Sequence, residues 1–432
     1  MPLAWAFAGT AGLLLLLLVL SWARFDQGMH PVFLFLALLS LFQGGRLLAF
    51  CLPGLSFNPM SIDLATQPFD ILQQQQRLAL FALALSAVCI YLPSRLFNLR
   101  LQFRAPETGL VPYLLVIFLA CFPFHVFKNY EYLMFVRSHG GYLAIFQSQE
   151  HLDQAGLAVR VLSQLCSASF FAYFAMERPR LRLWIVTAAY CSVSVVELLI
   201  GLRGKVLLTL LGLLFLAKMK RGTRFRPLGL ISVALVVSVL AQAAAIFRES
   251  KRADTTILDA PQALLRSQGV SIGVLESAIA YRDQFSKHNL SYLAHNLTLA
   301  FNEQDPKNEP LGRVFDDDLS YFLNPSGFRL GFGTGGSYLA EAWLFAGFAG
   351  IVLESLAIAS LLGWCARNFG GMALPFVWTL TVALLYLPRQ DLGVALGGAA
   401  KGCIGIAFAM ALSHFLRTGW QTIQRAYTPP GG

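Results

Sequence analysis

The chain has 432 residues, of which 56% are hydrophobic and only 13% are charged, and its net charge is +10. A soluble protein of this length needs a larger charged surface, so the composition excludes an ordinary water-soluble fold. In a membrane protein, an excess of Lys and Arg first reflects orientation in the bilayer and not nucleic-acid binding. Apolar stretches long enough to cross a hydrocarbon layer of ~30 Å recur along the chain. We therefore predict an all-α, polytopic membrane protein.

About 11 transmembrane helices are expected. The apolar stretches lie at residues 3–22, 31–50, 77–93, 109–127, 159–176, 183–201, 204–218, 228–247, 336–363, 372–387 and 393–414. The first is expected to be a retained span, because it has neither the basic start nor the small-residue cleavage site of a signal peptide. None of the seven cysteines forms a CxxC pair, so the sequence indicates no disulfide framework and no zinc site.

Basic segments set the predicted orientation and the division of the chain. The segments rich in Lys and Arg are 95–104, 178–182, 218–226 and 417–425. With eleven spans and an outer N-terminus, all of these segments fall on one side, which the positive-inside rule assigns to the cytoplasm. Residues 1–247 then hold eight helices and a small outer loop at 128–158. Residues 248–335 form a large outer loop of short amphipathic helices, and 336–432 hold the last three helices and a cytoplasmic tail.

Charged residues interrupt the apolar run 183–217, in the stretch "ELLIGLRGKVLLTLLG" at 197–212. Each charge near the bilayer centre costs about 2.5–3.5 kcal/mol on insertion scales. Here "GLRG" is the expected tip of a tight outer hairpin, which places Arg203 at or just below the outer surface. Arg203 could simply anchor the hairpin by reaching the interface. The alternative is that it belongs to a site for an anion.

Other cations reach the same predicted depth. Arg46 ends the second span, Arg248 ends the eighth, and Arg389 lies in the turn "LPRQDL" between the last two, while Lys205 is one step inward of Arg203. The positive-inside rule predicts the opposite bias for short outer turns. Because the planar guanidinium fork suits phosphate oxygens, the clustering favours a bound anion such as a lipid pyrophosphate.

Acidic residues accompany these cations. Glu197 could form a buried ion pair with Lys205 or Arg203, since buried charges are usually paired. Glu276 lies in the large loop, and Glu341 opens the ninth predicted span after a glycine-rich turn whose free N–H groups could hold an anion.

The segment "FDDDLSYF", with aspartates at 316, 317 and 318, raises the question of a metal site. Three consecutive aspartates do not share one helical face, and aspartate before a helix is a favoured cap. The seven histidines show no ligand spacing either. We therefore expect neither a metal nor another cofactor.

Four segments together resemble the Wzy-type oligosaccharide repeat-unit polymerases of bacterial O-antigen and related surface glycans. "GLRGKVLLTLLG" looks like the family's Gly-x-Arg hairpin, and "SQGVSIGVLESAIAY" looks like the start of its large periplasmic loop. "GTGGSYLAEAWLFAGFAG" is similar to its Gly-Ser-x-x-x-Glu entry into the following span, and "LPRQDL" matches its late periplasmic arginine. The apolar N-terminal region has no counterpart in the family pattern.

The resemblance implies a GT-C-like glycosyltransferase in the bacterial inner membrane, with its active site facing the periplasm. It would transfer an undecaprenyl-pyrophosphate-linked chain onto a lipid-linked repeat unit, and a chain-length regulator is a candidate partner. By residue match, the resemblance implies three roles. Pyrophosphate binding falls to Arg203, Arg389, Arg248, Arg266 and Lys205; general-base catalysis to Glu276, Glu341 or Glu197; and substrate binding to Tyr281, Gly335, Gly336 and Ser337.

Three other functions fit parts of the same pattern. A ligase that moves the finished glycan onto a lipid core would share the topology and the arginines. A flippase or transporter of a lipid-linked anion would place basic residues along the full depth of a cavity, whereas here they gather near the outer face. A non-catalytic partner that organises an assembly would tolerate the loss of Arg203.

Overall fold

The computed structural model describes residues 3–24, 30–51, 73–96, 101, 103, 109–139, 156–200, 203–221, 223, 265, 268–299, 312, 314–329 and 333–427. Within these ranges every regular element is helical and there is no β-strand. Seven of the described helices are long and apolar enough to cross a membrane. The chain is therefore an all-α, multi-pass membrane protein. The total of about 11 spans stays a prediction, because the expected span 228–247 lies outside the described residues.

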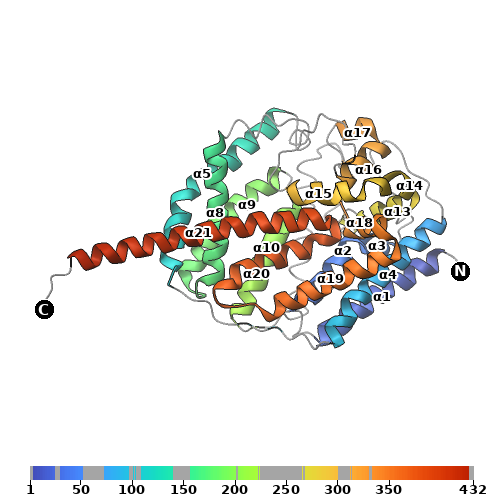
Figure 1. Ribbon diagram of the computed structural model, residues 1–432, viewed down its shortest axis with the longest axis horizontal. Helices are drawn as coiled ribbons and strands as arrows, with labels where there is room; N and C mark the ends of the chain where they lie inside the picture. The colour runs from blue at the N-terminus through green and yellow to red at the C-terminus, as the bar shows by residue number, and fades with distance from the viewer. Residues whose placement is uncertain are drawn as a thin grey trace.

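The described helices fall into a first and a second half of the chain (Figure 1). The first half contains α1 (Leu3–Arg24), α2 (Pro31–Phe42), α3 (Gly45–Phe50), α4 (Gln73–Leu96), α5 (Val111–Ser138), α8 (Gly156–Met176), α9 (Leu181–Ile200) and α10 (Arg203–Lys220). The second contains α13 (Ser271–Ala280), α14 (Arg282–Phe285), η3 (Ser286–His288), α15 (Asn289–Leu299), α16 (Phe315–Leu323), α17 (Pro325–Arg329), α18 (Tyr338–Ala346), α19 (Phe348–Arg367), η4 (Gly371–Ala373), α20 (Leu374–Tyr386), η5 (Leu387–Arg389) and α21 (Leu392–Tyr427).

Two predicted spans are broken, which corrects the sequence-based boundaries. The stretch 31–50 divides at Gln43 and Gly44 into α2 and α3. The stretch 336–363 divides at Gly347, whose φ of +60° only glycine adopts readily. At ~1.5 Å per residue, α18 is too short to cross a bilayer. Hydropathy alone missed both breaks, because most residues on either side of each break are apolar.

The helix α13, in the predicted outer loop, is buried along almost its whole length. Residues 271–279 are all buried, and the helix packs against α4 and α18. The segment that leads into α13 packs closely against the start of α3. A Cβ on Gly269 would lie 2.3 Å from the backbone nitrogen of Arg46. This part of the loop therefore belongs to the helical core and does not form an amphipathic surface helix.

The longest helix, α21, crosses the body of the molecule and projects beyond it to the C-terminus (Figure 1). It continues past the predicted end at 414 to Tyr427. Its first turns lie beside α15. The start of this helix therefore meets the elements of the predicted large loop.

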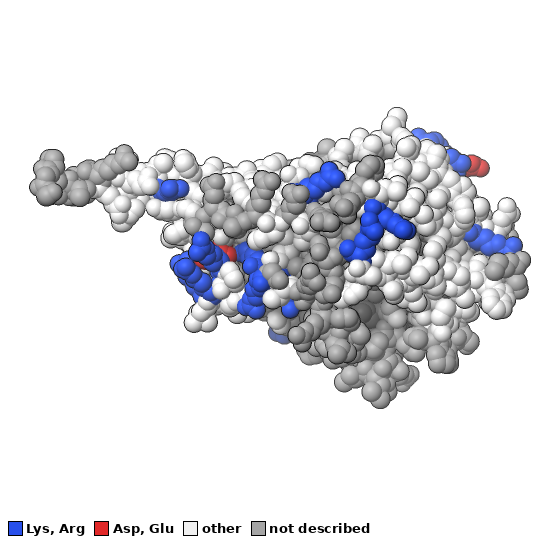
Figure 2. Space-filling model, turned by 90° about the horizontal axis from the view of Figure 1, so that it is seen from below, with Lys and Arg blue, Asp and Glu red and all other residues white. Residues whose placement is uncertain are grey.

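The ends of α8, α9 and α10 form a charged region that we call the Glu177 corner, defined by Glu177, Arg182 and Lys220. The Arg182 guanidinium pairs with the Glu177 carboxylate. The Lys220 ammonium donates to the backbone oxygens of Phe174 and, at 2.6 Å, of Glu177. These charged groups therefore use one another and the end of α8 as partners. On the face shown in Figure 2, described Lys and Arg side chains outnumber acidic ones, in line with the net charge.

Candidate active site

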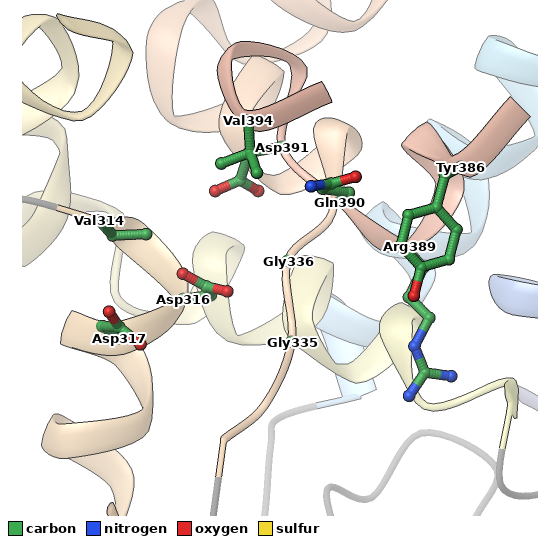
Figure 3. A pocket seen from close by; sticks show the side chains of 10 residues that line it. All are labelled: Val314, Asp316, Asp317, Gly335, Gly336, Tyr386, Arg389, Gln390, Asp391 and Val394. Carbon is green, nitrogen blue, oxygen red and sulfur yellow. The ribbon is translucent and has the colours of Figure 1, made fainter. Parts of the chain in front are cut away.

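A cavity of about 260 Å³ lies where the start of α16, the segment before α18, and the turn from η5 into α21 meet (Figure 3). At ~30 Å³ per water, this volume equals that of about nine water molecules, which is enough for one sugar ring. Gly335 and Gly336 form part of its wall. Without side chains at these positions, a ligand can approach the backbone closely.

One end of the cavity is formed by Arg389 of η5. The Arg389 Nη1 donates a hydrogen bond of 2.6 Å to Gln268 Oε1, and the guanidinium carbon lies 5.7 Å from the centre of the Phe42 ring. Residues from α2, from the entry to α13 and from η5 therefore converge on this side chain. A guanidinium held in this way keeps further N–H donors for a ligand, because it carries five.

The other end of the cavity is acidic. Asp316 comes from the first turn of α16 and Asp391 from the residue before α21, and in Figure 3 the two carboxylates point toward a common space. The backbone of Gly335 and Gly336 runs between them and Arg389. The cavity thus presents carboxylates at one end and a guanidinium at the other, separated by a glycine wall.

Asp391 is held in place on both of its oxygens. Its Oδ1 accepts from the Ser337 backbone nitrogen at 3.1 Å, and its Oδ2 accepts from Asn296 Nδ2 at 3.3 Å. A Cβ on Gly336 would lie 2.8 Å from Asp391 Oδ1, so glycine is needed for this close approach. Asp391 thereby joins α15, the entry of α18 and the start of α21.

Burial raises the pKa of the acidic residues at this end. The pKa of Asp316 rises to about 6, chiefly through burial and further through the neighbouring Asp318 carboxylate. The pKa of Asp391 rises well above its ordinary value through burial, and then through the Glu341 and Asp316 carboxylates. At neutral pH, Asp316 is consequently ionised but binds a proton readily.

Glu341, one of the predicted bases, lies beside the cavity and contacts the start of α21. Its Oε2 accepts a hydrogen bond of 2.7 Å from the Leu392 backbone nitrogen. A carboxylate at this place satisfies a free N–H of the first helical turn and complements the helix dipole. Its Oε1 accepts no hydrogen bond from the described residues. Glu341 therefore holds α21 with one oxygen.

Gln43 connects the broken second span to this site. Its side-chain nitrogen donates to Ser337 Oγ at 2.8 Å and to the Pro388 carbonyl at 2.7 Å. These bonds tie the end of α2 to both walls of the cavity. Neither hydropathy nor the motifs indicated a role for Gln43, although a glutamine followed by two glycines inside an apolar run was a visible signal. It also missed Asp391, which lies two positions after Arg389 in the segment that had been singled out.

The structure separates two predicted residues from the cavity. Glu276 is fully buried in α13, neither of its carboxyl oxygens accepts a hydrogen bond from the described residues, and burial raises its pKa to about 8. Glu197 is buried on α9, whose main neighbours are α5, α8 and α10. Neither residue lines the cavity.

The predicted substrate residues divide in the same way. Gly335 and Gly336 line the cavity. The Ser337 backbone nitrogen donates a hydrogen bond to Asp391, which also lines it. The Tyr281 ring instead packs edge-on against Phe322, with the ring centres 4.9 Å apart, and it is not part of the cavity lining.

Of the predicted arginines, Arg389 is the one that the structure places at the cavity; Arg248 and Arg266 lie outside the described residues. For Arg203 and Lys205 the structure describes the backbone, at the start of α10. Phe215 stacks on Trp378, and a Cβ on Gly212 would contact Trp378 and Val382. The helices α10 and α20 therefore run antiparallel. The start of α10 lies at the end of this pair where α20 passes into η5, which carries Arg389.

Among the described residues, no group of three or more His, Cys, Asp or Glu side chains has the arrangement needed to hold a metal ion. The aspartates of α16 form no such group, and the expectation of a metal-independent site stays a prediction.

Comparison with known protein families matches residues 6–395 of the 432 to the family described as O-antigen polysaccharide polymerase Wzy. Comparisons with curated proteins and with solved structures give no match. The family match begins within α1 and extends through the cavity to the first turn of α21. It therefore covers most of the apolar N-terminal helix, which the motifs had left unassigned. The chain therefore belongs to the O-antigen polysaccharide polymerase Wzy family of membrane glycan polymerases.

Proposed function

We propose that this protein transfers an oligosaccharide chain from undecaprenyl pyrophosphate onto a lipid-linked repeat unit, and that the transfer takes place in the cavity between α16, α18 and η5. Family membership supports polymerisation of lipid-linked repeat units in O-antigen synthesis. The observation that carries the site is the presence of Arg389 and three aspartates on one cavity with a glycine wall. In this proposal the cavity faces the periplasm from the bacterial inner membrane. The proposal keeps the predicted division of the chain into residues 1–247, 248–335 and 336–432.

The reaction matches the groups at the cavity. An acceptor hydroxyl attacks the anomeric carbon of the donor, and the lipid pyrophosphate leaves with the bonding electrons. Pyrophosphate is a good leaving group, so the main requirement is stabilisation of its charge in a site shielded from water, which fixed cations supply. Arg389 fills this role in the proposal, and Arg203, Arg248, Arg266 and Lys205 remain candidates to assist it.

The acceptor hydroxyl must also lose a proton, for which a carboxylate is a suitable base. Of the three predicted glutamates, Glu341 lies next to the cavity. Glu276 on α13 and Glu197 on α9 do not line it. The base is therefore sought among the carboxylates at the acidic end.

A strain without its own polymerase, complemented with single variants, tests this proposal. Arg389→Ala is expected to replace the ladder of surface glycan on a gel with single repeat units, because one lost anion-stabilising donor costs about 10²–10³-fold in rate. Arg203→Ala is expected to do the same. Arg182→Ala, in the Glu177 corner, is the matched control and should keep the ladder. Normal ladders from both Arg389→Ala and Arg203→Ala, at equal protein levels in the membrane, would reject the proposal.

A further inference from the structure

The three aspartates at the start of α16 have different surroundings. Asp318 is buried, and its Oδ2 accepts hydrogen bonds of 2.8 Å from the Tyr292 hydroxyl and from the Gly312 backbone nitrogen. Asp318 therefore fastens α16 to α15 and to Gly312. Asp316 and Asp317 line the cavity instead. The segment that raised a metal question thus contains one structural aspartate and two that face a possible ligand.

Among the aspartates that line the cavity, Asp316 is the one with a buried oxygen that lacks a hydrogen-bond donor in the described part of the chain. Its Oδ1 is buried and accepts no hydrogen bond from the described residues, and Figure 3 shows the carboxylate directed into the cavity. Both oxygens of Asp391 are already engaged, and Asp317 has an interaction of its own. A buried oxygen without a donor costs free energy that a ligand hydroxyl would recover.

We propose that Asp316 is the general base of the transfer and that the acidic end of the cavity is the subsite for the acceptor sugar. This inference rests on the proposed function. The acceptor hydroxyl donates its hydrogen to Asp316 Oδ1, and its oxygen forms the new bond to the anomeric carbon of the donor. The proton passes to the Asp316 carboxylate, while the electrons of the broken bond leave with the lipid pyrophosphate at Arg389.

The arrangement of the cavity supports this division of labour. Asp316 and Arg389 lie on opposite sides of the Gly335–Gly336 backbone, so the base faces one side of a reacting carbon while the cation faces the leaving group on the other. Separation of the two also prevents a direct ion pair that would neutralise both. The subsite selects a neutral sugar with free hydroxyls, because a uronic acid would bring a further negative charge next to Asp316 and Asp391.

The neighbouring carboxylates are better suited to positioning. Glu341 binds the first turn of α21 through Leu392, and Asp391 binds Ser337 and Asn296. Proton uptake by either group would weaken contacts that shape the cavity. The pKa of Asp316, about 6, allows it to be ionised at neutral pH and still accept a proton.

The test uses the purified full-length protein in phospholipid vesicles, with a donor and an acceptor that each carry a lipid pyrophosphate. Asp316→Asn keeps the size of the side chain and removes the base. It is expected to lower transfer by about 10²–10⁴-fold while donor binding stays unchanged. Asp283→Asn, at an exposed site on α14, is the matched control. The wild-type rate should fall as pH drops below about 6, where Asp316 becomes protonated, and the residual rate of Asp316→Asn should not show this decrease.

The outcomes separate this inference from the proposed function. Transfer by Asp316→Asn near the wild-type rate, with the same loss at low pH, would overturn the base assignment. Loss of donor binding in Asp316→Asn would also overturn it, because a base should not hold the pyrophosphate. Recovery of Asp316→Ala activity on addition of formate would support it. If Arg389→Ala instead polymerises normally, the proposed function fails whatever Asp316 does.

Discussion

The cavity and the Glu177 corner both have charged side chains at the ends of helices. The two regions differ in the hydrogen-bond and ion-pair partners that these side chains have. In the Glu177 corner the glutamate pairs with Arg182, and Lys220 binds backbone oxygens of α8. At the cavity, Asp316 Oδ1 and Glu341 Oε1 accept no hydrogen bond from the described residues. Buried charges that serve structure are usually paired. Those without partners at a cavity indicate a site for a ligand.

This comparison explains why arginine content alone is a poor guide to the site. The sequence places many cations near helix ends, and most positions of this kind are inexpensive. Arg389 and Arg182 each end or begin a helix, yet Arg389 borders a cavity with carboxylates at its other end while Arg182 is half exposed beside its partner. The difference lies in the surroundings of the charge, which only the fold supplies.

Replacement of arginine by lysine should show the largest difference in transfer rate between the cavity and the Glu177 corner. Arg389→Lys keeps the charge but removes the planar fork that can bind Gln268 and phosphate oxygens together. We expect transfer to fall about tenfold or more, measured with purified protein. Arg182→Lys should transfer at the wild-type rate. Equal effects in the two regions would contradict the distinction between them.

Methyl groups added to the glycine wall test the shape of the cavity. Gly336→Ala would set a Cβ 2.8 Å from Asp391 Oδ1 and displace that carboxylate. Because misplacement by ~1 Å can cost about 10²-fold in rate, we expect a tenfold or greater loss of transfer. Gly333→Ala is the control, since its Cβ would meet Ser320 Oγ at an ordinary 3.8 Å. Full activity of Gly336→Ala would show that the reaction occurs elsewhere.

Gln43→Leu tests whether the break between α2 and α3 supports the site. The variant leaves Ser337 Oγ and the Pro388 carbonyl without their donor, which costs about 1–3 kcal/mol for each buried group left unpaired. We expect a lower Tm and a several-fold slower transfer, with shorter glycan chains on the gel. A variant with unchanged Tm and chain length would remove Gln43 from the account.

Glu177→Gln should have a smaller effect, and on stability alone. Its partner Arg182 is 48% exposed, so the lost ion pair is worth about 1 kcal/mol or less. A thermal unfolding curve in detergent should show a slightly lower Tm, and the glycan ladder should stay normal. A lost ladder at normal protein level would mean that the Glu177 corner also takes part in the reaction.

Treatment with EDTA is expected to have the smallest effect. The described residues provide no metal-binding group of three or more acidic, His or Cys side chains, and cationic side chains are proposed to stabilise the pyrophosphate. Turnover by purified protein should therefore continue in the chelator. Loss of turnover that Mg²⁺ or Mn²⁺ restores would assign a metal to the carboxylate end.

The sequence predicted the helical class and several residues that the structure places at one cavity. Long apolar runs predict spans reliably, as at 3–22 and 159–176, which match α1 and α8 closely. Arg389, Gly335 and Gly336, which the motif resemblance singled out, line one cavity in the structure, and their roles stay predictions. The roles assigned to Arg203, Glu276 and Glu197 stay predictions.

What the sequence could not provide depends on contacts between distant segments. Gln43 and Asp391 matter because the folded chain brings α2, α15 and α21 together, and hydropathy contains no sign of this. The aspartates of α16 look alike in the sequence. Only the fold separates Asp318, whose Oδ2 is bonded to Tyr292 and Gly312, from Asp316, which lines the cavity.

The central claim is that Arg389 binds the pyrophosphate of the donor while the carboxylates at the other end of the same cavity bind the acceptor sugar. A cryo-electron microscopy structure with the lipid-pyrophosphate donor bound tests it most directly. The account predicts phosphate density within hydrogen-bond distance of the Arg389 guanidinium and the first sugar against Gly335 and Gly336, on the side facing Asp316. Phosphate density bound away from Arg389, with this cavity empty, would contradict it.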